Sequence, residues 1–161
     1  METSETKFLN LEKAVAVFIN DFVSTYKGLL IRDDKKASGN LLNSIREYSI
    51  EFTDGKMEGS IELASYWKYV EYGRKPGKWP PRDKILEWIK VKPVLPRPVN
   101  GLKPPTQEQM AFLVCRKIGR DGIEPGGQFK EALDLVWERR KGEIERAVAD
   151  DLQAAVDLIR I

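Results

Sequence analysis

The sequence predicts an α+β fold: a small antiparallel sheet that includes a hairpin at about 45–64, packed by an N-terminal helix and C-terminal helices. Three observations lead to this class. Apolar residues recur at helical spacing near the N-terminus, a turn dipeptide separates two segments of strand-forming residues, and helical spacing returns in the last third of the chain. In this order, the helices are expected to cover one face of the sheet.

The N-terminal helix is predicted from Phe8 to the region 28–31, where apolar periodicity gives way to charges and turn formers. Its apolar side chains are separated by three and four residues in turn: Leu11, Val15, Phe18, Phe22 and Tyr26. This spacing also occurs in coiled coils, but three turns of it favour packing on a sheet. A short helical turn is expected next at 40–44, with Ser38 or Asn40 as its N-cap.

The hairpin is predicted from Asp54-Gly55, a dipeptide that suits a two-residue type I′ turn. Such a turn sets the register of the strands on either side. The residues expected to face each other are Thr53 and Lys56, Phe52 and Met57, Glu51 and Glu58, Ile50 and Gly59, and Tyr48 and Ile61. An isolated hairpin is only marginally stable in water, so we expect this one to pack against the first helix or a later one.

Three more helical segments follow the hairpin. One lies at about 82–90 after Pro80-Pro81, with its apolar residues on one side: Ile85, Trp88 and Ile89. The next begins at Thr106, an N-cap for which Gln109 is the capping-box partner. Its apolar side consists of Met110, Leu113, Val114 and Ile118, with Cys115 as a small buried residue beside them and Gly119 near the end. The last segment begins near Gln128 and forms either one long helix or two helices joined at Gly142.

The length of the chain favours one folding unit. A chain of 161 residues with 42% hydrophobic content can bury one core and is short for two domains. We therefore expect a single domain over residues 1–161, with a C-terminal helical extension at about 142–161. The segment 91–105 repeats proline too often for a helix or a central strand, so it should form an extended, polyproline-like excursion.

Catalysis is not expected from this composition. The chain has no histidine, the usual general base near neutral pH, and its single cysteine, Cys115, has no base to activate it. Adjacent acids such as Asp33-Asp34 point apart rather than toward one metal, and "GRKPGK" lacks the spacing of a phosphate-binding loop. We therefore expect no enzyme activity, no cofactor and no metal.

Membrane insertion and secretion are not expected either. The apolar runs are shorter than the roughly 20 residues that span a bilayer. The first ten residues, "METSETKFLN", lack the basic and apolar regions of a secretory signal. The sequence thus predicts a soluble protein that stays where it is made.

The segment Tyr66–Pro81, "YWKYVEYGRKPGKWPP", has an unusual composition of five aromatic residues, four cations and three prolines with one acid. It opens a stretch, 66–120, in which 13 basic and four acidic residues give a net charge of +9, whereas residues 1–65 and 121–161 carry −3 and −4. Such a block suits nucleic acid, an acidic partner protein, or the acidic flanks of a neighbouring copy.

Rigid aromatic side chains beside arginine and proline are typical of protein-protein contacts. The candidate interface residues are Tyr72, Arg74, Lys75, Lys78, Trp79, Pro80 and Arg97. A second interpretation fits the rings equally well, because Trp67, Tyr72 and Trp79 have the size of core residues beneath a surface loop.

Several segments together resemble the small tail-completion, or head-to-tail joining, proteins of tailed bacteriophages. They are "SGNLLNSI" (38–45), the hairpin, the segment 66–81 and "GIEPGGQFKEAL" (122–133), so the resemblance spans about residues 38–133. Arg74 stands where that family usually has threonine, and "EPGGQF" has glycines where an aromatic residue or proline is common. The proline-rich insertion at 91–105 lengthens the chain relative to a minimal member.

The resemblance implies a virion structural protein of the phage neck. It would be a head-tail connector without catalytic activity that forms a ring between portal and tail. Its partners would be further copies of itself and portal, adaptor or tail proteins, with DNA passing through the channel and no membrane contact. It would reside in the host cytoplasm during assembly and then in the neck or tail region of the virion.

Two other functions remain open. In a small nucleic-acid-binding module, the basic aromatic loop at 66–84 would place cations on phosphates and stack Trp79 or Tyr72 on a base. The cations are Arg74, Lys75, Lys78, Arg82 and Lys84. A cytoplasmic adaptor would instead dock its amphipathic terminal helix, at 144–158, on a partner.

Overall fold

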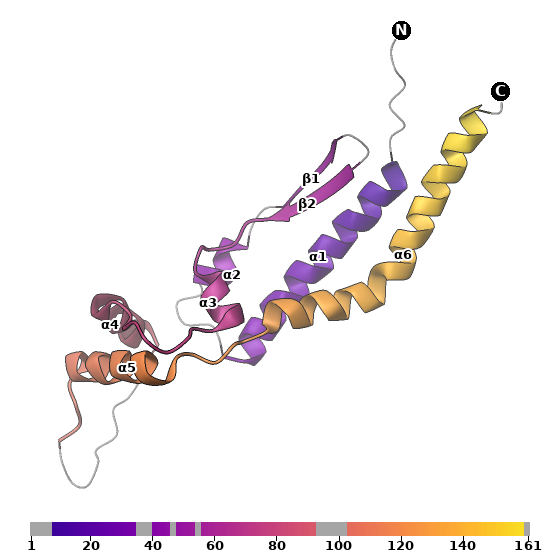
Figure 1. Ribbon diagram of the computed structural model, residues 1–161. Coiled ribbons are helices and arrows are strands. Elements are labelled where there is room, and N and C mark those ends of the chain that lie inside the picture. The colour runs from indigo at the N-terminus through magenta and orange to yellow at the C-terminus, as the bar shows by residue number, and fades with distance from the viewer. Residues whose placement is uncertain (1–7, 35–39, 46–47, 54–55, 93–102, 160–161) are drawn as a thin grey trace. The chain divides into compact units, whose positions relative to one another are not determined.

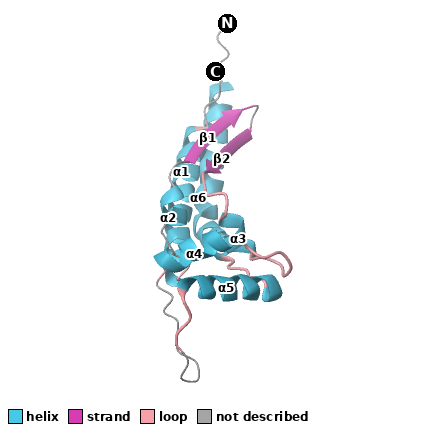
Figure 2. Ribbon diagram, turned by 90° about the vertical axis from the view of Figure 1, so that its left-hand side faces the viewer, coloured by secondary structure: helices cyan, strands magenta, loops and turns pink. Residues whose placement is uncertain are grey.

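The computed structural model describes residues 8–34, 40–45, 48–53, 56–92 and 103–159. Helices make up most of this part of the chain, and its sheet is a two-stranded antiparallel hairpin (Figure 2). The predicted α+β class is therefore confirmed. The elements in chain order (Figure 1) are α1 (Leu9–Arg32), α2 (Asn40–Ser44), β1 (Tyr48–Thr53), β2 (Lys56–Ile61), α3 (Trp67–Tyr72), α4 (Arg82–Val91), α5 (Gln107–Asp121) and α6 (Gln128–Ile159).

The chain forms two compact units, each built from separate segments. Unit 1 consists of Met1–Leu29, Ile45–Glu62 and Gln128–Ile161, and so includes most of α1, the hairpin and α6. Unit 2 consists of Leu30–Ser44 and Leu63–Gly127, and so includes the end of α1 and the helices α2 to α5. That the whole chain is a single domain stays a prediction.

The core of unit 1 is a cluster of aromatic rings between α1 and α6. Phe22 and Tyr26 on α1 are buried, and both rings meet Phe129 of α6 edge-on, with centroid distances of 4.9 and 5.5 Å. The sequence predicted both α1 residues. It missed Ile19, which is also buried and faces the hairpin.

The hairpin has the predicted register, from Thr53 opposite Lys56 to Tyr48 opposite Ile61. Gly59 allows β2 to approach α1 closely, because a Cβ atom at this position would come within 2.8 Å of Ile19 Cδ1. The expected packing of the hairpin on the first helix is thus confirmed. The turn residues, 54–55, lie outside the described part of the chain.

α6 is one continuous helix of 32 residues that bends along its length (Figure 1), so the alternative of two helices joined at Gly142 is wrong. The buried carboxylate of Asp151 connects its second half to the start of α1. It accepts hydrogen bonds from the backbone N–H groups of Asn10 and Leu11, at 3.2 and 2.9 Å. Because the first N–H groups of a helix have no partner within the helix, this carboxylate acts as a cap for α1.

α1 also has the length and composition of a helix that could cross a membrane. Two features of unit 1 assign it to the core instead. Its Phe22 and Tyr26 side chains are buried in the ring cluster, and Asp21 accepts a hydrogen bond from Arg140 Nε of α6 at 2.7 Å. A charged residue at mid-helix with a partner on a packed neighbour is typical of a protein core near water. The absence of membrane contact stays a prediction.

Unit 2 contains the predicted short helices. α2 and α4 lie where the sequence placed them, and α5 begins with the predicted capping box. In that box Gln109 N donates to Thr106 Oγ1 at 3.3 Å and Thr106 N donates to Gln109 Oε1 at 2.9 Å. Ser38, one candidate cap of α2, lies outside the described residues, as does most of the proline-rich segment 91–105.

The buried side of α5 differs from the prediction. Its fully buried residues are Ala111, Cys115 and Gly119, spaced by four, whereas the predicted Leu113 is about half exposed. At Gly119 the small residue is required because the Trp79 ring lies against the helix there, and a Cβ atom would come within 2.4 Å of Trp79 Cδ1. Cys115 is buried as predicted, and burial raises the pKa of its thiol.

Candidate functional site

Two distant segments of unit 2 are joined by a short antiparallel bridge between Arg74 and Ile123. Arg74 N donates to Ile123 O, and Ile123 N donates to Arg74 O, both at 2.8 Å. Glycines precede both residues in the chain, and both have positive φ angles, 67° at Gly73 and 78° at Gly122. We call these four residues the clasp.

Only glycine fits at the two glycine positions of the clasp. A Cβ atom on Gly73 would lie 2.2 Å from Ile123 O, and one on Gly122 would lie 2.2 Å from Arg74 O. Both contacts are with backbone atoms, which cannot move aside as a flexible side chain would. The positive φ angles add strain for any other residue. The glycines of "VEYGR" and "RDGIE" are therefore required by the backbone itself.

Further backbone hydrogen bonds hold the loop after α3 in place. Gly126 N donates to Val70 O and Glu71 O at 3.0 Å, and Gly77 N donates to Gly119 O at 2.8 Å. The Arg74 guanidinium donates to Lys78 O at 2.8 Å, which closes the loop on itself. The loop at 73–81 is thus a defined structure attached to the end of α5.

The predicted interface residues on this loop differ in their exposure. Tyr72 is 67% exposed, and Lys75 and Lys78 are exposed as well. Trp79 is about half exposed: one part of the ring covers Gly119, and its edge meets Phe112 at a centroid distance of 5.5 Å. Trp79 was interpreted either as an interface residue or as a core residue beneath the loop. It packs on α5 and also keeps an accessible face, so it fits both interpretations in part.

The remaining predicted site residues play other roles or lie elsewhere. Arg74 is half-buried, and its guanidinium donates a hydrogen bond to Lys78 O within the loop. Pro80 is half-buried at the end of the loop, before α4 begins. Arg97 lies outside the described residues. Of the predicted set, Tyr72, Lys75 and Lys78 are exposed, and Trp79 is about half exposed.

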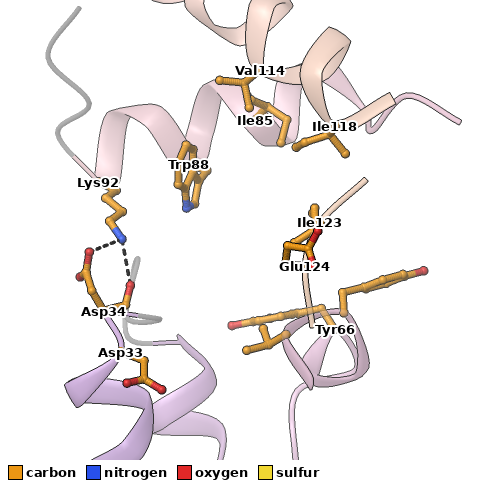
Figure 3. A pocket seen from close by; sticks show the side chains of 12 residues that line it. Asp33, Asp34, Tyr66, Ile85, Trp88, Lys92, Val114, Ile118, Ile123 and Glu124 are labelled. Carbon is orange, nitrogen blue, oxygen red and sulfur yellow. Dashed lines mark hydrogen bonds and ion pairs between the residues drawn. The ribbon is translucent and has the colours of Figure 1, made fainter. Parts of the chain in front are cut away.

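A second site, which the sequence analysis did not identify, is an apolar groove in unit 2 with a volume of about 560 Å³ (Figure 3). Its apolar wall comes from α3 and the residue before it, from α4 and α5, and from Ile123 of the clasp. We call it the aromatic groove. It is lined by Tyr66, Tyr69, Val70, Ile85, Trp88, Val114, Ile118 and Ile123, with Asp33, Asp34, Lys92 and Glu124 as its polar residues.

Figure 3 shows how the walls of the groove face each other. Trp88 projects from α4 into the groove, and Ile85, Val114 and Ile118 lie beside it on α4 and α5. Tyr66 lies on the opposite side, next to Ile123 and Glu124. Burial raises the pKa of the Tyr66 phenol above its ordinary value of 10.0.

The polar residues of the groove are mostly acidic. Lys92 Nζ lies 2.6 Å from Asp34 Oδ2 and also donates to the backbone O of Asp34 at 2.9 Å (Figure 3). Asp33 is paired with Arg32 at 2.7 Å. Glu124 is exposed and has no ion pair with any other residue in the described part of the chain.

The sequence contained a signal for this groove. Tyr66, Tyr69 and Val70 share one face of α3 by their spacing, and Ile85 and Trp88 share one face of α4. The sequence did not indicate that these faces of α3 and α4 lie around the same groove. The clasp and the hydrogen bonds from Gly126 N to Val70 O and Glu71 O hold the segment at 122–126 beside α3, and α4 packs directly on α5.

Within the described ranges, no group of three or more His, Cys, Asp or Glu side chains is arranged to hold a metal ion. Comparisons with models of known protein families, with curated proteins and with solved structures found no match. The resemblance to phage joining proteins therefore stays a prediction based on its motifs.

Proposed function

We propose that this chain is a structural protein of the neck of a tailed bacteriophage, a head-tail connector that assembles as a ring between portal and tail and performs no catalysis. The observation that carries the proposal is the clasp. It connects the segments at 66–81 and 122–133, two of those on which the resemblance rests, through paired backbone hydrogen bonds and two glycines that tolerate no side chain.

The surface of the loop supports a role in contacts. Tyr72, Lys75 and Lys78 are exposed on a loop that is held by backbone bonds, so they can contact a partner without ordering the loop first. The loop belongs to the cationic stretch of the chain, whereas both flanking stretches are acidic. Opposite charges on different parts of one chain favour head-to-tail contacts between copies, which can close into a ring.

The test uses a triple variant, Tyr72→Ala, Lys75→Glu and Lys78→Glu, expressed in place of the wild-type chain during phage growth. We expect folded protein but far fewer joined particles, because the contact surface is reversed in charge. The matched control, Arg116→Glu with Lys117→Glu, changes two exposed cations of α5 and should leave assembly intact. The readout is quantitative mass spectrometry of purified DNA-filled particles, with the copy number compared with that of the portal.

Two results would overturn the proposal. One is absence of the wild-type chain from purified particles. The other is normal assembly by the triple variant, which would mean that this loop makes no contact needed for joining.

A nucleic-acid-binding function is the second candidate, favoured by the exposed cations beside an accessible Trp79 face. It predicts DNA binding that weakens steeply as salt increases, because neutralised phosphates release counterions. Retention of the wild-type chain on DNA at low salt, together with its absence from particles, would select this function over the neck protein.

A further inference from the structure

We propose that the aromatic groove binds the proline-rich segment at 93–102 of a second copy of the chain, as an extended strand with Arg97 directed toward Glu124. This inference specifies a contact between neighbours in the proposed ring. The inference rests on the proposed function only in taking the assembly to be a ring in the phage neck. The binding of the segment to the groove can be measured on purified protein, whatever the assembly is.

The walls of the groove suit an extended proline-rich ligand. Tyr66, Tyr69 and Trp88 present three aromatic side chains around one hollow, and Tyr69 remains 60% exposed. Proline-rich segments dock in grooves lined by aromatic rings, since a polyproline helix is already extended and loses little entropy on binding. A groove of this composition therefore selects prolines over a flexible polar segment.

Charge supports the same ligand. The groove contains three carboxylates and one lysine, so it is net acidic, and all three carboxylates come from outside the cationic stretch at 66–120. Asp33 and Asp34 already have cationic partners, which leaves Glu124 to pair with a ligand. The segment "PVLPRPVNGL" carries one arginine and no acid. An arginine from the ligand would meet Glu124 at the edge of the groove.

The spacing within the segment matches this binding mode. A polyproline helix has three residues per turn, so residues three apart share one face. Pro93, Pro96 and Val99 have this spacing and would contact the rings. Arg97 follows on a different face and is free to reach the acidic edge of the groove.

A second copy fits better than the same chain. Lys92 is part of the groove wall and is bound to Asp34, so the proline-rich segment starts at the wall itself. To fill its own groove, the segment would have to reverse at once, but Pro93, Pro96 and Pro98 stiffen this part. The residues suited to a tight reversal, Asn100-Gly101, come only at its far end.

The binding test uses a fluorescent peptide with the sequence of residues 91–104 and the full-length chain, at dilutions where sedimentation shows a monomer. We expect saturable binding by anisotropy. Trp88→Ala should weaken it at least about tenfold, since a central ring of the groove is lost. Because Trp88 also packs in unit 2, circular dichroism and a second variant on the exposed edge accompany it.

That second variant is a charge exchange. Glu124→Arg should weaken binding of the wild-type peptide, and a peptide with Arg97→Glu should bind the wild-type chain poorly. Combined, the two changes should restore binding, which a merely structural effect of either change would not do. A peptide with Pro93→Ala and Pro96→Ala should bind more weakly, because it must be ordered on binding.

Three results would overturn the inference: no saturable binding to the wild-type chain, binding unaffected by Glu124→Arg, or binding only after residues 93–102 of the chain are replaced by a glycine-serine linker. The last result would mean that the chain's own segment fills the groove. Peptide binding by a chain that is absent from phage particles would retain the groove and reject the neck function. If the chain is present in particles but does not bind the peptide, the neck function is retained and the inference about the groove is rejected.

Discussion

Unit 1 and unit 2 are held together in different ways. Unit 1 relies on side-chain packing between long elements, with the ring cluster of Phe22, Tyr26 and Phe129 at its centre. Unit 2 consists of short helices whose connections are set by backbone hydrogen bonds, above all those of the clasp. The first design depends on side-chain volume, and the second depends on glycines at positions where a Cβ atom cannot fit.

The two units also differ in how they use their aromatic residues, for the core in unit 1 and for the surface in unit 2. Unit 1 buries Phe22 and Tyr26 in its ring cluster, while Phe52 and Trp137 remain about half exposed. Unit 2 leaves Tyr69, Tyr72 and part of Trp79 exposed while its backbone holds them in defined positions. A unit ordered by its backbone can present large side chains without using them for its own core, which is what a contact surface requires.

The largest effect is expected from Phe22→Ala in unit 1. The ring is almost completely buried and contacts two others, so its removal should cost about 3–5 kcal/mol of unfolding free energy. Hydrogen exchange should show the loss in α1 and α6 first. Val17→Ala on the same helix, where the side chain is partly exposed, is the control and should stay within about 0.5 kcal/mol. Equal losses from both changes would contradict a core centred on these rings.

Next is Gly122→Ala in unit 2, which should cost on the order of 3 kcal/mol through the backbone contact and the positive φ angle. Exchange should rise at Arg74 and Ile123, and the peptide should no longer bind the groove. The matched change is Gly142→Ala in α6, which has open space around it and should stabilise the chain by about 0.5–1 kcal/mol. If both alanine variants behave alike, the clasp does not order unit 2.

A smaller effect is expected from Asp151→Ala, which removes the carboxylate that caps α1. The backbone N–H groups of Asn10 and Leu11 would lose their acceptor, at a cost of about 2 kcal/mol. Exchange should increase at the start of α1, with unit 2 unchanged. Asp150→Ala alters the neighbouring, exposed carboxylate and should have little effect. A similar result for the two aspartates would argue against the cap.

The smallest effect concerns pH in unit 2. The backbone N–H of Glu108 in the first turn of α5, and then the Thr106 hydroxyl, lower the pKa of the Glu108 carboxyl below its ordinary value of 4.5. A lowered pKa in the folded state means that the stabilisation is present above pH 4.5 and is lost as the pH falls through the folded value. Wild type and Glu108→Gln should therefore differ in melting temperature at pH 7 and converge near pH 3. A constant difference would show that the carboxylate charge is not involved.

The helices, the strands and much of their local chemistry can be predicted from the residues alone. The register of the hairpin follows from a two-residue turn and the alternation of its strands, and the start of α5 follows from Thr106 and Gln109. Helical spacing identified Phe22 and Tyr26 as core residues. These features depend on neighbours a few residues apart, which a single sequence displays directly.

The contacts between residues far apart in the chain could not be predicted in this way and are known from the fold. Gly119 on the buried row of α5 accommodates the ring of Trp79, which lies 40 residues earlier in the chain. The clasp joins Arg74 to Ile123 through backbone hydrogen bonds, which side-chain periodicity does not predict. The aromatic groove likewise forms from faces that were each visible in the sequence. Their meeting depends on long-range backbone hydrogen bonds and on the packing of α4 on α5, which residue types alone do not specify.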